Sequence, residues 1–512
     1  MQTVNQTFNS FVLGNVQPVT WRLRISFPKN ITPNIQFFTL DESQLDGSGL
    51  LAPDDSLVVQ PWDAYDYKAY DDRVVNMEIT HEELQPYSSA KAYADLTLNN
   101  YDLLFSPDSY SPISADVLPQ RPFRLFLGFE NTALPMFVGL NDKMPIIDRV
   151  QATAKFHMVD FLSFLYSQEV SQSVILLDKR IDEILSELLQ LLGLIPDQFD
   201  LDVSTTVIPF FYVPKGNLFG GVAEKLMEAE LGRLYMNELG VIRFRNRYGY
   251  DDTPVMTFST ALSNVNDWRG SNDNNIWNSV RVKANPREVK EYQPIYQSLE
   301  EHVFSASQTK DIWLNLDDPI ISATAPTYSA TEVSDAPYYI ATNSGVVLSN
   351  MEEFAEAIKL TFTNTTETEQ SITDIVVWGE PAKPIYESPI EVVEINDTSV
   401  NKYGNQWYEV ENDYIQSETM ARNRALTILN DYKELNSVVE LDVKGNPALQ
   451  VGDFITLDIP GYSGNYSISK ITNIMTANPL SYRQRLMVRI RPMVTFFTLD
   501  ESQLDGGDVL GI

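Results

Sequence analysis

Alternation of hydrophobic and polar residues predicts that this chain is built mainly of β-strands. The clearest example is the segment 92–98, in which Ala94, Leu96 and Leu98 share one face and polar residues share the other. The same period predicts strands at 74–80, 123–129, 136–140 and 150–157, and one strand-like piece lies at 21–27 within an otherwise extended arm. Half-buried antiparallel strands at this spacing indicate a small barrel or sandwich over residues 73–165.

Apolar residues at helical spacing predict three longer helices. The first covers residues 179–192, where six apolar residues at helical spacing precede Gly193: Ile181, Ile184, Leu185, Leu188, Leu189 and Leu192. The second covers 218–230 after Asn217 as a plausible cap, and the third covers 417–433. The second helix leads into a predicted hairpin, with strands at 233–237 and 241–245 and a turn through Gly240. A further helix is expected to start at Val159-Asp160-Phe161-Leu162.

A stretch rich in Ser, Thr, Pro and Asp separates the hairpin from the third helix. It contains strand-like runs at 359–364 and 372–378, so residues 286–404 are interpreted as an inserted β-sandwich. Four more strands are predicted after the third helix, at 438–443, 453–459, 466–474 and 485–491.

The two ends of the chain carry the same peptide. The sequence FFTLDESQLDG occupies residues 37–47 and again residues 496–506. It fails the template of a calcium-binding loop, and it is either a docking peptide that adds a strand to a neighbour or a spliced or duplicated linker. The docking hypothesis gives the candidate interaction residues Phe37, Phe38, Leu40, Leu45, Phe496, Phe497, Leu499 and Leu504.

A second candidate interaction site is the aromatic cluster WDAYDYKAY, which contains Trp62, Tyr65, Tyr67 and Tyr70. Flat rings beside acidic groups are typical of a carbohydrate-binding platform. The alternative is that buried rings anchor an extended arm on a neighbour, which the Pro- and Gly-rich flanks favour.

Composition limits the functions that this sequence can serve. A length of 512 residues indicates about three to five domains. There are no cysteines and three histidines, which excludes disulfides and thiolate chemistry and leaves little for metal binding. No run is long and apolar enough to span a bilayer and the start lacks signal-peptide features, so we expect a soluble protein.

Seventy acidic against 37 basic residues give a net charge of −33. Sequence-independent DNA binding requires cations at the phosphates, so this charge predicts that nucleic acid is repelled. Two explanations stay open: an ordinary soluble acidic surface, or a surface along which DNA slides without being held.

Motifs of catalysis are missing from the sequence. There is no glycine-rich phosphate loop, nucleophile elbow or His-Glu-x-x-His helix, and the Ser-x-x-Lys pattern at 88–91 lacks its companion motifs. We therefore predict no enzyme activity, no catalytic or metal-binding residues and no cofactor.

Three segments together resemble a known family. They are LFGGVAEKLMEAELGRLYMNELGVIRFR at 218–245, NPALQVGDFITLD at 446–458, and the pair MFVGL at 136–140 with KFHMVDFL at 155–162. In this order they resemble the tail-hub, or baseplate-hub, proteins of tailed bacteriophages and contractile injection systems. The resemblance covers about residues 74–290 and 405–492.

The resemblance implies a homotrimer in which each chain contributes two tube-type β-domains around a channel. The first would be near 74–160 and the second near 206–285 with 405–445. The implied function is a structural hub of a tail tip or baseplate. It joins the hexameric tail tube and distal tail protein to a fibre or spike, and it surrounds the tape-measure protein and DNA as passing cargo.

The expected fold class is mainly β with a few helices, in several domains. The resemblance also implies a virion location after assembly in the host cytoplasm. Two alternatives remain: a tail component that binds or degrades host carbohydrate through the insertion or the aromatic cluster, and an unrelated adhesin.

The expected divisions are an arm at 1–72, a tube-type domain at 73–165, a helical segment at 166–205, a helix-hairpin part at 206–285, the sandwich at 286–404, a helix and barrel at 405–495, and an arm at 496–512.

Overall fold

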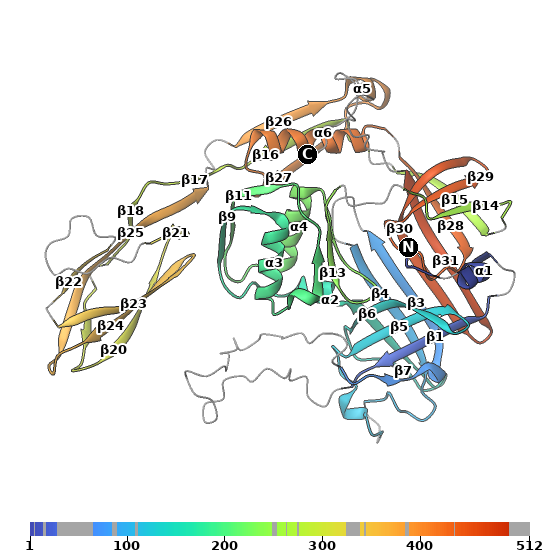
Figure 1. Ribbon diagram of the computed structural model, residues 1–512, viewed down its shortest axis with the longest axis horizontal. Coiled ribbons are helices and arrows are strands. Elements are labelled where there is room, and N and C mark those ends of the chain that lie inside the picture. The colour runs from blue at the N-terminus through green and yellow to red at the C-terminus, as the bar shows by residue number, and fades with distance from the viewer. Residues whose placement is uncertain are drawn as a thin grey trace.

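The structure is a computed structural model. It describes residues 1–4, 6–13, 17–27, 65–83, 90–107, 111–247, 253–262, 264–273, 276–298, 300–323, 338–342, 345–384, 389–434 and 436–490. Strands dominate these ranges, which confirms the prediction of a mainly β chain with several domains. Figure 1 shows a large sheet on the right, a central unit with helices, and an elongated insertion on the left.

The large sheet consists of two halves. The first half contains β1 (Val19–Ile25), β2 (Lys68–Ala69), β3 (Val74–Glu83), β4 (Ala90–Asn99), β5 (Pro122–Phe129), β6 (Thr132–Asn141), β7 (Ile146–Asp148) and β8 (Thr153–Asp160). The second half contains β14 (Met256–Ser259), β15 (Val265–Asp273), β28 (Asn436–Lys444), β29 (Phe454–Ile459), β30 (Tyr462–Ala477) and β31 (Leu480–Ile490). Each half has a hydrophobic core, and Ala448, Met475 and Tyr482 of the second half also pack into the core of the first.

The two halves join edge to edge through antiparallel pairing of β3 with β30. The resulting order is β15-β28-β31-β30-β3-β4-β8-β6-β5-β1-β2. The described part of this sheet is open, with β15 and β2 at its two ends. Alternation along β4 places Ala92, Ala94, Leu96 and Leu98 in the core, as the sequence pattern predicts.

The N-terminal region differs from the expected extended arm. Residues 6–13 form helix α1 (Gln6–Leu13), and β1 pairs with β5 inside the large sheet. Phe8 and Val12 lie one helical turn apart and are buried, and the Phe8 ring lies 4.9 Å from the ring of Phe129. An apolar stripe on one short helix therefore packs this region onto the first half.

Another difference lies at the start of β8. The sequence predicts a strand from residue 150, whereas β8 begins at Thr153. Val150 is 98% exposed in the preceding turn, because the chain reverses there between β7 and β8.

The central unit combines two groups of elements around one core. The first group is α2 (Phe161–Leu165), β9 (Val174–Arg180), α3 (Ile181–Leu191), β10 (Phe199–Leu201), β11 (Val207–Val213), α4 (Phe219–Glu230), β12 (Arg233–Met236) and β13 (Ile242–Arg245). The second group is β16 (Ser279–Ala284), β26 (Ile390–Ile395), α5 (Asp397–Tyr403), β27 (Trp407–Asn412) and α6 (Glu418–Tyr432). The predicted helices and hairpin are present, and α6 packs on one face of the β26-β16-β27 sheet.

Helix α4 begins without the expected Asn217 cap. Leu218 occupies the N-cap position and makes no side-chain cap bond. Instead, the N–H groups of Phe219 and Gly220 donate to the carbonyls of Gln168 and Tyr166, at 2.9 and 3.2 Å. The preceding chain therefore satisfies the first turn of the helix, which a local sequence pattern does not reveal.

The insertion is a separate β-rich body with its own core. Its strands are β17 (Arg287–Val289), β18 (Gln293–Ser298), β19 (His302–Phe304), β20 (Thr309–Asn315), β21 (Ile320–Ser322), β22 (Tyr338–Thr342), β23 (Val346–Phe354), β24 (Ala357–Asn364) and β25 (Gln370–Pro384). They form one sheet organised around β25 and a second sheet in the order β20-β24-β23.

Two of the expected divisions are placed differently by the strand pairings. Residues 390–403 were expected in the insertion, but β26 and α5 belong to the central unit. Residues 207–245 were expected in a second tube-type domain, but they also belong to the central unit, and the second half uses strands from 256–273 and 436–490 instead. Local periodicity identifies an element, whereas pairing partners decide which sheet it joins.

Substitution of Gly139 tests the contact between β6 and β8. A Cβ at this position would lie 2.2 Å from the carbonyl oxygen of Val159 and 2.5 Å from the Phe137 ring. We expect Gly139→Ala to lower the free energy of unfolding by about 1–3 kcal/mol, because a buried backbone must shift. The measurement is thermal unfolding of the full chain.

Gly221→Ala is the matched control for Gly139→Ala. Gly221 is exposed in α4, and a Cβ added there would have no atom within 4 Å, so alanine should stabilise the helix by about 0.5–1 kcal/mol. Equal melting temperatures for Gly139→Ala and the wild type would contradict the close approach of β6 to β8.

Candidate functional site

Most of the interaction residues expected from the sequence lie outside the described residues. These are Phe37, Phe38, Leu40, Leu45, Trp62, Phe496, Phe497, Leu499 and Leu504. The docking hypothesis for the repeated peptide therefore stays a prediction.

The tyrosines of the aromatic cluster pack against the body of the protein. Tyr70 is buried in the core of the first half, with its ring 5.4 Å from the ring of Phe105. Tyr65 packs against the core of the central unit, where burial raises the pKa of its hydroxyl. The guanidinium of Arg124 lies 5.5 Å from the Tyr67 ring centre. Tyr65 and Tyr70 therefore do not present a shared open face to solvent.

The three segments that carry the family resemblance meet at one junction. The strand-to-helix segment ends at Asp160, which caps α2 by accepting a hydrogen bond from Ser163 N at 2.6 Å. The other carboxylate oxygen of Asp160 accepts from Ala92 N on β4, at 2.7 Å. Phe161 N lies 3.3 Å from Sδ of Met236 in the hairpin. Asp160 therefore ties β4 of the first half to α2, and Phe161 connects the start of α2 to the hairpin.

Asp160 is completely buried, and desolvation raises the pKa of its carboxyl. The hydrogen bonds from Ser163 and Ala92 and the proximity of His81 act in the opposite direction. The group is thus enclosed and saturated with partners, as is typical of a scaffold residue.

The corner at 450–453 reaches the hairpin from the second half of the sheet. The side-chain amide of Gln450 donates to Glu238 at 2.6 Å, and the backbone N–H of Gln450 donates to Asp453 at 2.8 Å. Gly452 adopts φ +90°, and a Cβ there would lie 2.4 Å from Nη2 of Arg233. Arg233 is 6% exposed and lies 5.0 Å from the Tyr235 ring centre. The turn thus requires glycine both for its backbone and for its closeness to Arg233.

A cavity of about 860 Å³ lies at this junction. Its lining includes Arg233, Glu238, Arg243 and Arg245 of the hairpin and Asp453 of the corner. Arg243 pairs with Asp200 at 3.2 Å and Arg245 pairs with Asp202, so these charges are already compensated within the chain. Burial raises the pKa of Asp453.

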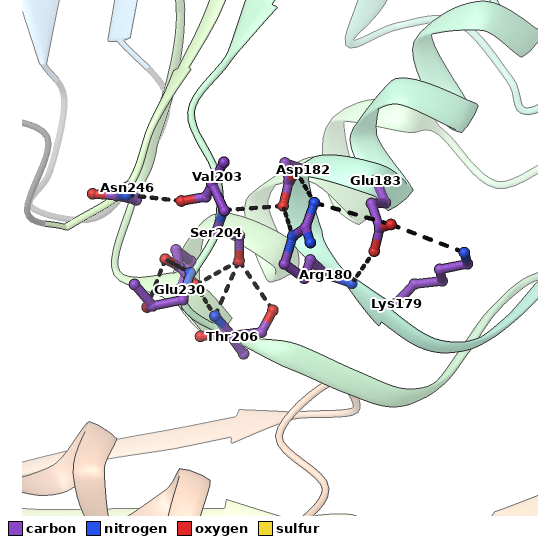
Figure 2. Close-up of polar contacts among 10 residues, drawn as sticks. Lys179, Arg180, Asp182, Glu183, Val203, Ser204, Thr206, Glu230 and Asn246 are labelled. Atoms are coloured by element: carbon purple, nitrogen blue, oxygen red, sulfur yellow. Dashed lines mark hydrogen bonds and ion pairs between the residues drawn. The ribbon is translucent and has the colours of Figure 1, made fainter. Parts of the chain in front are cut away.

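Glu230, at the end of α4, forms a second polar cluster (Figure 2). Its carboxylate accepts hydrogen bonds from the N–H groups of Thr205 and Thr206 and from the hydroxyl groups of Ser204 and Thr205, at 2.9–3.0 Å. Beside it, Arg180 donates two hydrogen bonds of 3.0 Å to Asp182, which in turn accepts from Ser204 N. The cluster fixes the loop before β11 against two helices.

The described residues contain no group of three His, Asp or Glu side chains arranged to hold one metal ion. None of the helices in the described ranges has the length and apolar character needed to cross a bilayer. The junction and the Glu230 cluster hold helices, strands and loops in place, because their polar groups form hydrogen bonds and ion pairs with one another.

The sequence pattern identified part of this site. The helix start predicted at 159–162 is confirmed, because α2 begins there with Asp160 as its N-cap. Glu230, Arg233 and Gln450 had no such signal, because their partners lie on elements that are distant in the sequence.

No protein-family model matches the chain, and a search of curated proteins gives no match. Solved structures do show similarity. They include a 43 kDa tail protein of prophage MuSo2 from Shewanella oneidensis, with 11% identity, coverage of 83% of this chain and 96% of that chain, and a TM-score of 0.45. A tail protein from Neisseria meningitidis MC58 has 9% identity, coverage of 83% and 94%, and a TM-score of 0.48.

A third similar structure is an E. coli component of the type VI secretion system, with 10% identity, coverage of 83% of this chain and 78% of that chain, and a TM-score of 0.37. The structural neighbours are thus phage tail proteins and a relative from a secretion machine.

Replacing Glu230 tests the polar cluster of Figure 2. Glu230→Gln removes the charge and replaces one accepting oxygen by an amide N–H₂, which cannot accept hydrogen bonds from the N–H and hydroxyl groups around it. We therefore expect a loss of about 2–3 kcal/mol in the free energy of unfolding. Amide hydrogen exchange at Thr205 and Thr206 should accelerate. The control is Glu224→Gln, at an exposed position of the same helix, which should change neither quantity.

The junction is tested by two glycines that both have positive φ. Gly452 adopts φ +90° beside Arg233, whereas Gly461 adopts φ +88° with nothing within 4 Å of a Cβ. Both alanine substitutions strain the backbone, but only Gly452→Ala also displaces Arg233, which should cost about 1–3 kcal/mol more. Thermal unfolding gives the difference between the variants. Equal losses would show that the contact with Arg233 contributes nothing.

Proposed function

We propose that this chain is the structural hub of a phage-type tail tip or baseplate and has no catalytic role. Three copies form a ring that joins the hexameric tail tube and the distal tail protein to a fibre or spike. The ring surrounds the channel that holds the tape-measure protein and passes DNA. This assignment places the chain in the virion, after assembly in the host cytoplasm.

The observation that carries the proposal is the large sheet with two halves. Each half has a hydrophobic core, and β3 and β30 join them into one continuous sheet. A trimer of such chains offers six halves around one axis, which matches a six-fold tube. The rigid junction of the three resembling segments supports the same function, because a hub must keep its two halves at a fixed angle.

The solvent face of the large sheet supports passage of DNA without binding. Three of its basic side chains pair with carboxylates: Lys470 with Glu82 at 2.9 Å, Arg483 with Asp442 at 3.5 Å, and Arg489 with Glu83 at 2.8 Å. Cations that are neutralised in this way are weak partners for phosphates. The net charge of −33 adds a general repulsion.

The mass of the purified full chain tests the ring. We expect a species of about three times the 58.1 kDa chain mass by mass photometry, and ring-shaped particles with a central hole and three-fold symmetry by electron microscopy. A chain that stays monomeric both alone and with its tube protein, or rings of another symmetry, would contradict the proposal.

A further inference from the structure

The outer face of the β20-β24-β23 sheet carries an exposed pair of aromatic rings. The inner face of this sheet is buried in the core of the insertion through Ile312, Leu314, Ile358, Leu360 and Phe362. On the opposite face Trp313 is 55% exposed and Phe354 is 38% exposed. Their ring centres are 5.4 Å apart with an angle of 31° between the planes. Ala357 of the middle strand pairs with Phe354 and has no large side chain, which leaves room for the rings to approach.

Charged groups lie next to the rings. Lys359 pairs with Trp313 across the strands, and its ammonium group lies 5.9 Å from the indole ring centre. The same ammonium group lies 3.3 Å from Asp311 and 3.5 Å from Glu352. Thr361 donates a hydrogen bond of 2.7 Å to Asp311. The carboxylates are thus held in fixed positions, yet they remain at the surface and can accept further hydrogen bonds.

Hydroxyl groups continue this face beyond the charges. The hydroxyl oxygens of Thr309 and Thr363 lie 3.1 Å apart, and the hydroxyl oxygen of Ser349 lies 3.2 Å from that of Thr363. The face therefore runs from an aromatic end, through a cluster of carboxylates around one lysine, to a hydroxyl end. We use the name aromatic face for Thr309, Asp311, Trp313, Ser349, Glu352, Phe354, Lys359, Thr361 and Thr363.

We propose that the aromatic face binds an uncharged saccharide. The C–H groups of a sugar ring pack on Trp313 and Phe354, and its hydroxyl groups bond to Asp311, Glu352 and the Ser and Thr hydroxyls. Large aromatic surfaces with a few fixed polar groups are the usual composition of a small-molecule site. The two rings lie near the β23–β24 hairpin, where Glu356 accepts hydrogen bonds from Ser173 and Tyr212 of the central unit, and both rings keep exposed surface there.

Size and charge favour a saccharide over other occupants. Three strands of about eight residues present roughly 400 Å², about half of what each partner contributes to a standard protein–protein interface. Anionic sugars and nucleic acids are disfavoured, because Lys359 is the only cation of the aromatic face and two carboxylates already neutralise it. The overall charge of −33 acts in the same direction.

The aromatic rings of Trp378, Tyr65 and Tyr70 are less accessible to solvent than the ring of Trp313. Trp378 of the insertion is only partly exposed and stacks on Tyr292, with ring centres 6.0 Å apart. Tyr65 and Tyr70 pack against hydrophobic cores. Trp313 faces solvent because it alternates with the buried Ile312 and Leu314 along β20.

The test uses the full chain on an array of linear oligosaccharides of glucose, galactose, mannose and N-acetylglucosamine, with uronic-acid oligomers for comparison. We expect binding of at least one neutral oligosaccharide, followed by titration calorimetry with that compound. Trp313→Ala should weaken the affinity by at least about tenfold, since a central tryptophan commonly dominates such contacts. Phe354→Ala should weaken it less.

Trp407→Ala is the matched control, because Trp407 is 44% exposed on a different sheet, in β27 of the central unit. It should leave the affinity within about twofold, and unchanged thermal unfolding of Trp313→Ala should show that this variant is folded. Three results would overturn the proposal: no neutral oligosaccharide retained, binding confined to uronic acids, or equal affinities for Trp313→Ala and wild type.

A self-association that Trp313→Ala abolishes would also overturn the proposal, because it would identify a second copy as the occupant. This inference is independent of the tail-hub proposal. If the chain forms a three-fold ring but binds no sugar, only the saccharide proposal is refuted. If it binds sugar but stays monomeric, only the ring proposal is refuted.

Discussion

Pairing between β3 and β30 is the constraint on which the rest of the molecule depends. It joins Asn76–Glu82 to Lys470–Thr476 in antiparallel register, although almost 400 residues separate them in the chain. Thr80 and Thr472 lie opposite each other with their hydroxyl groups 3.1 Å apart, and Lys470 pairs with Glu82 beside them. A shift of one residue would turn Met77, Ile79 and Met475 out of their core, so burial fixes the register. The two halves therefore behave as one sheet.

The junction at the hairpin adds a second connection between the same parts. Asp160 ties β4 to α2, and the corner at Gly452 presses against Arg233 of β12. The central unit is thus held by both halves of the sheet. This arrangement is stiff because its bonds run between elements that are distant in the sequence, and a stiff joint is what the proposed ring would require.

Local patterns predict much of the fold. Alternation along β4, the Ile and Leu spacing of α3, and the Gly240 turn are all properties of a few neighbouring residues, and the structure contains them. The failures concern contacts between distant elements. Residues 390–403 join the central unit because β26 pairs with β16, and α4 starts on carbonyls of Gln168 and Tyr166.

The candidate sites show the same limit. Sequence identifies an aromatic residue on a strand, but which face of the strand is covered depends on the second sheet. Trp378 and Trp313 look alike in the sequence, yet Trp378 stacks on Tyr292 and Trp313 is open. Glu230 and Arg233 were not identified in advance, because their partners come from other elements.

The central claim is that the two-half sheet of this chain surrounds the axis of a tail. A cryo-electron microscopy reconstruction of the intact particle tests it most directly. The account predicts three copies around the axis, with their six sheet halves adjoining the six-fold tube and enclosing an open channel. Density for this chain at the periphery of the particle, or in a number of copies that is not three, would contradict the account.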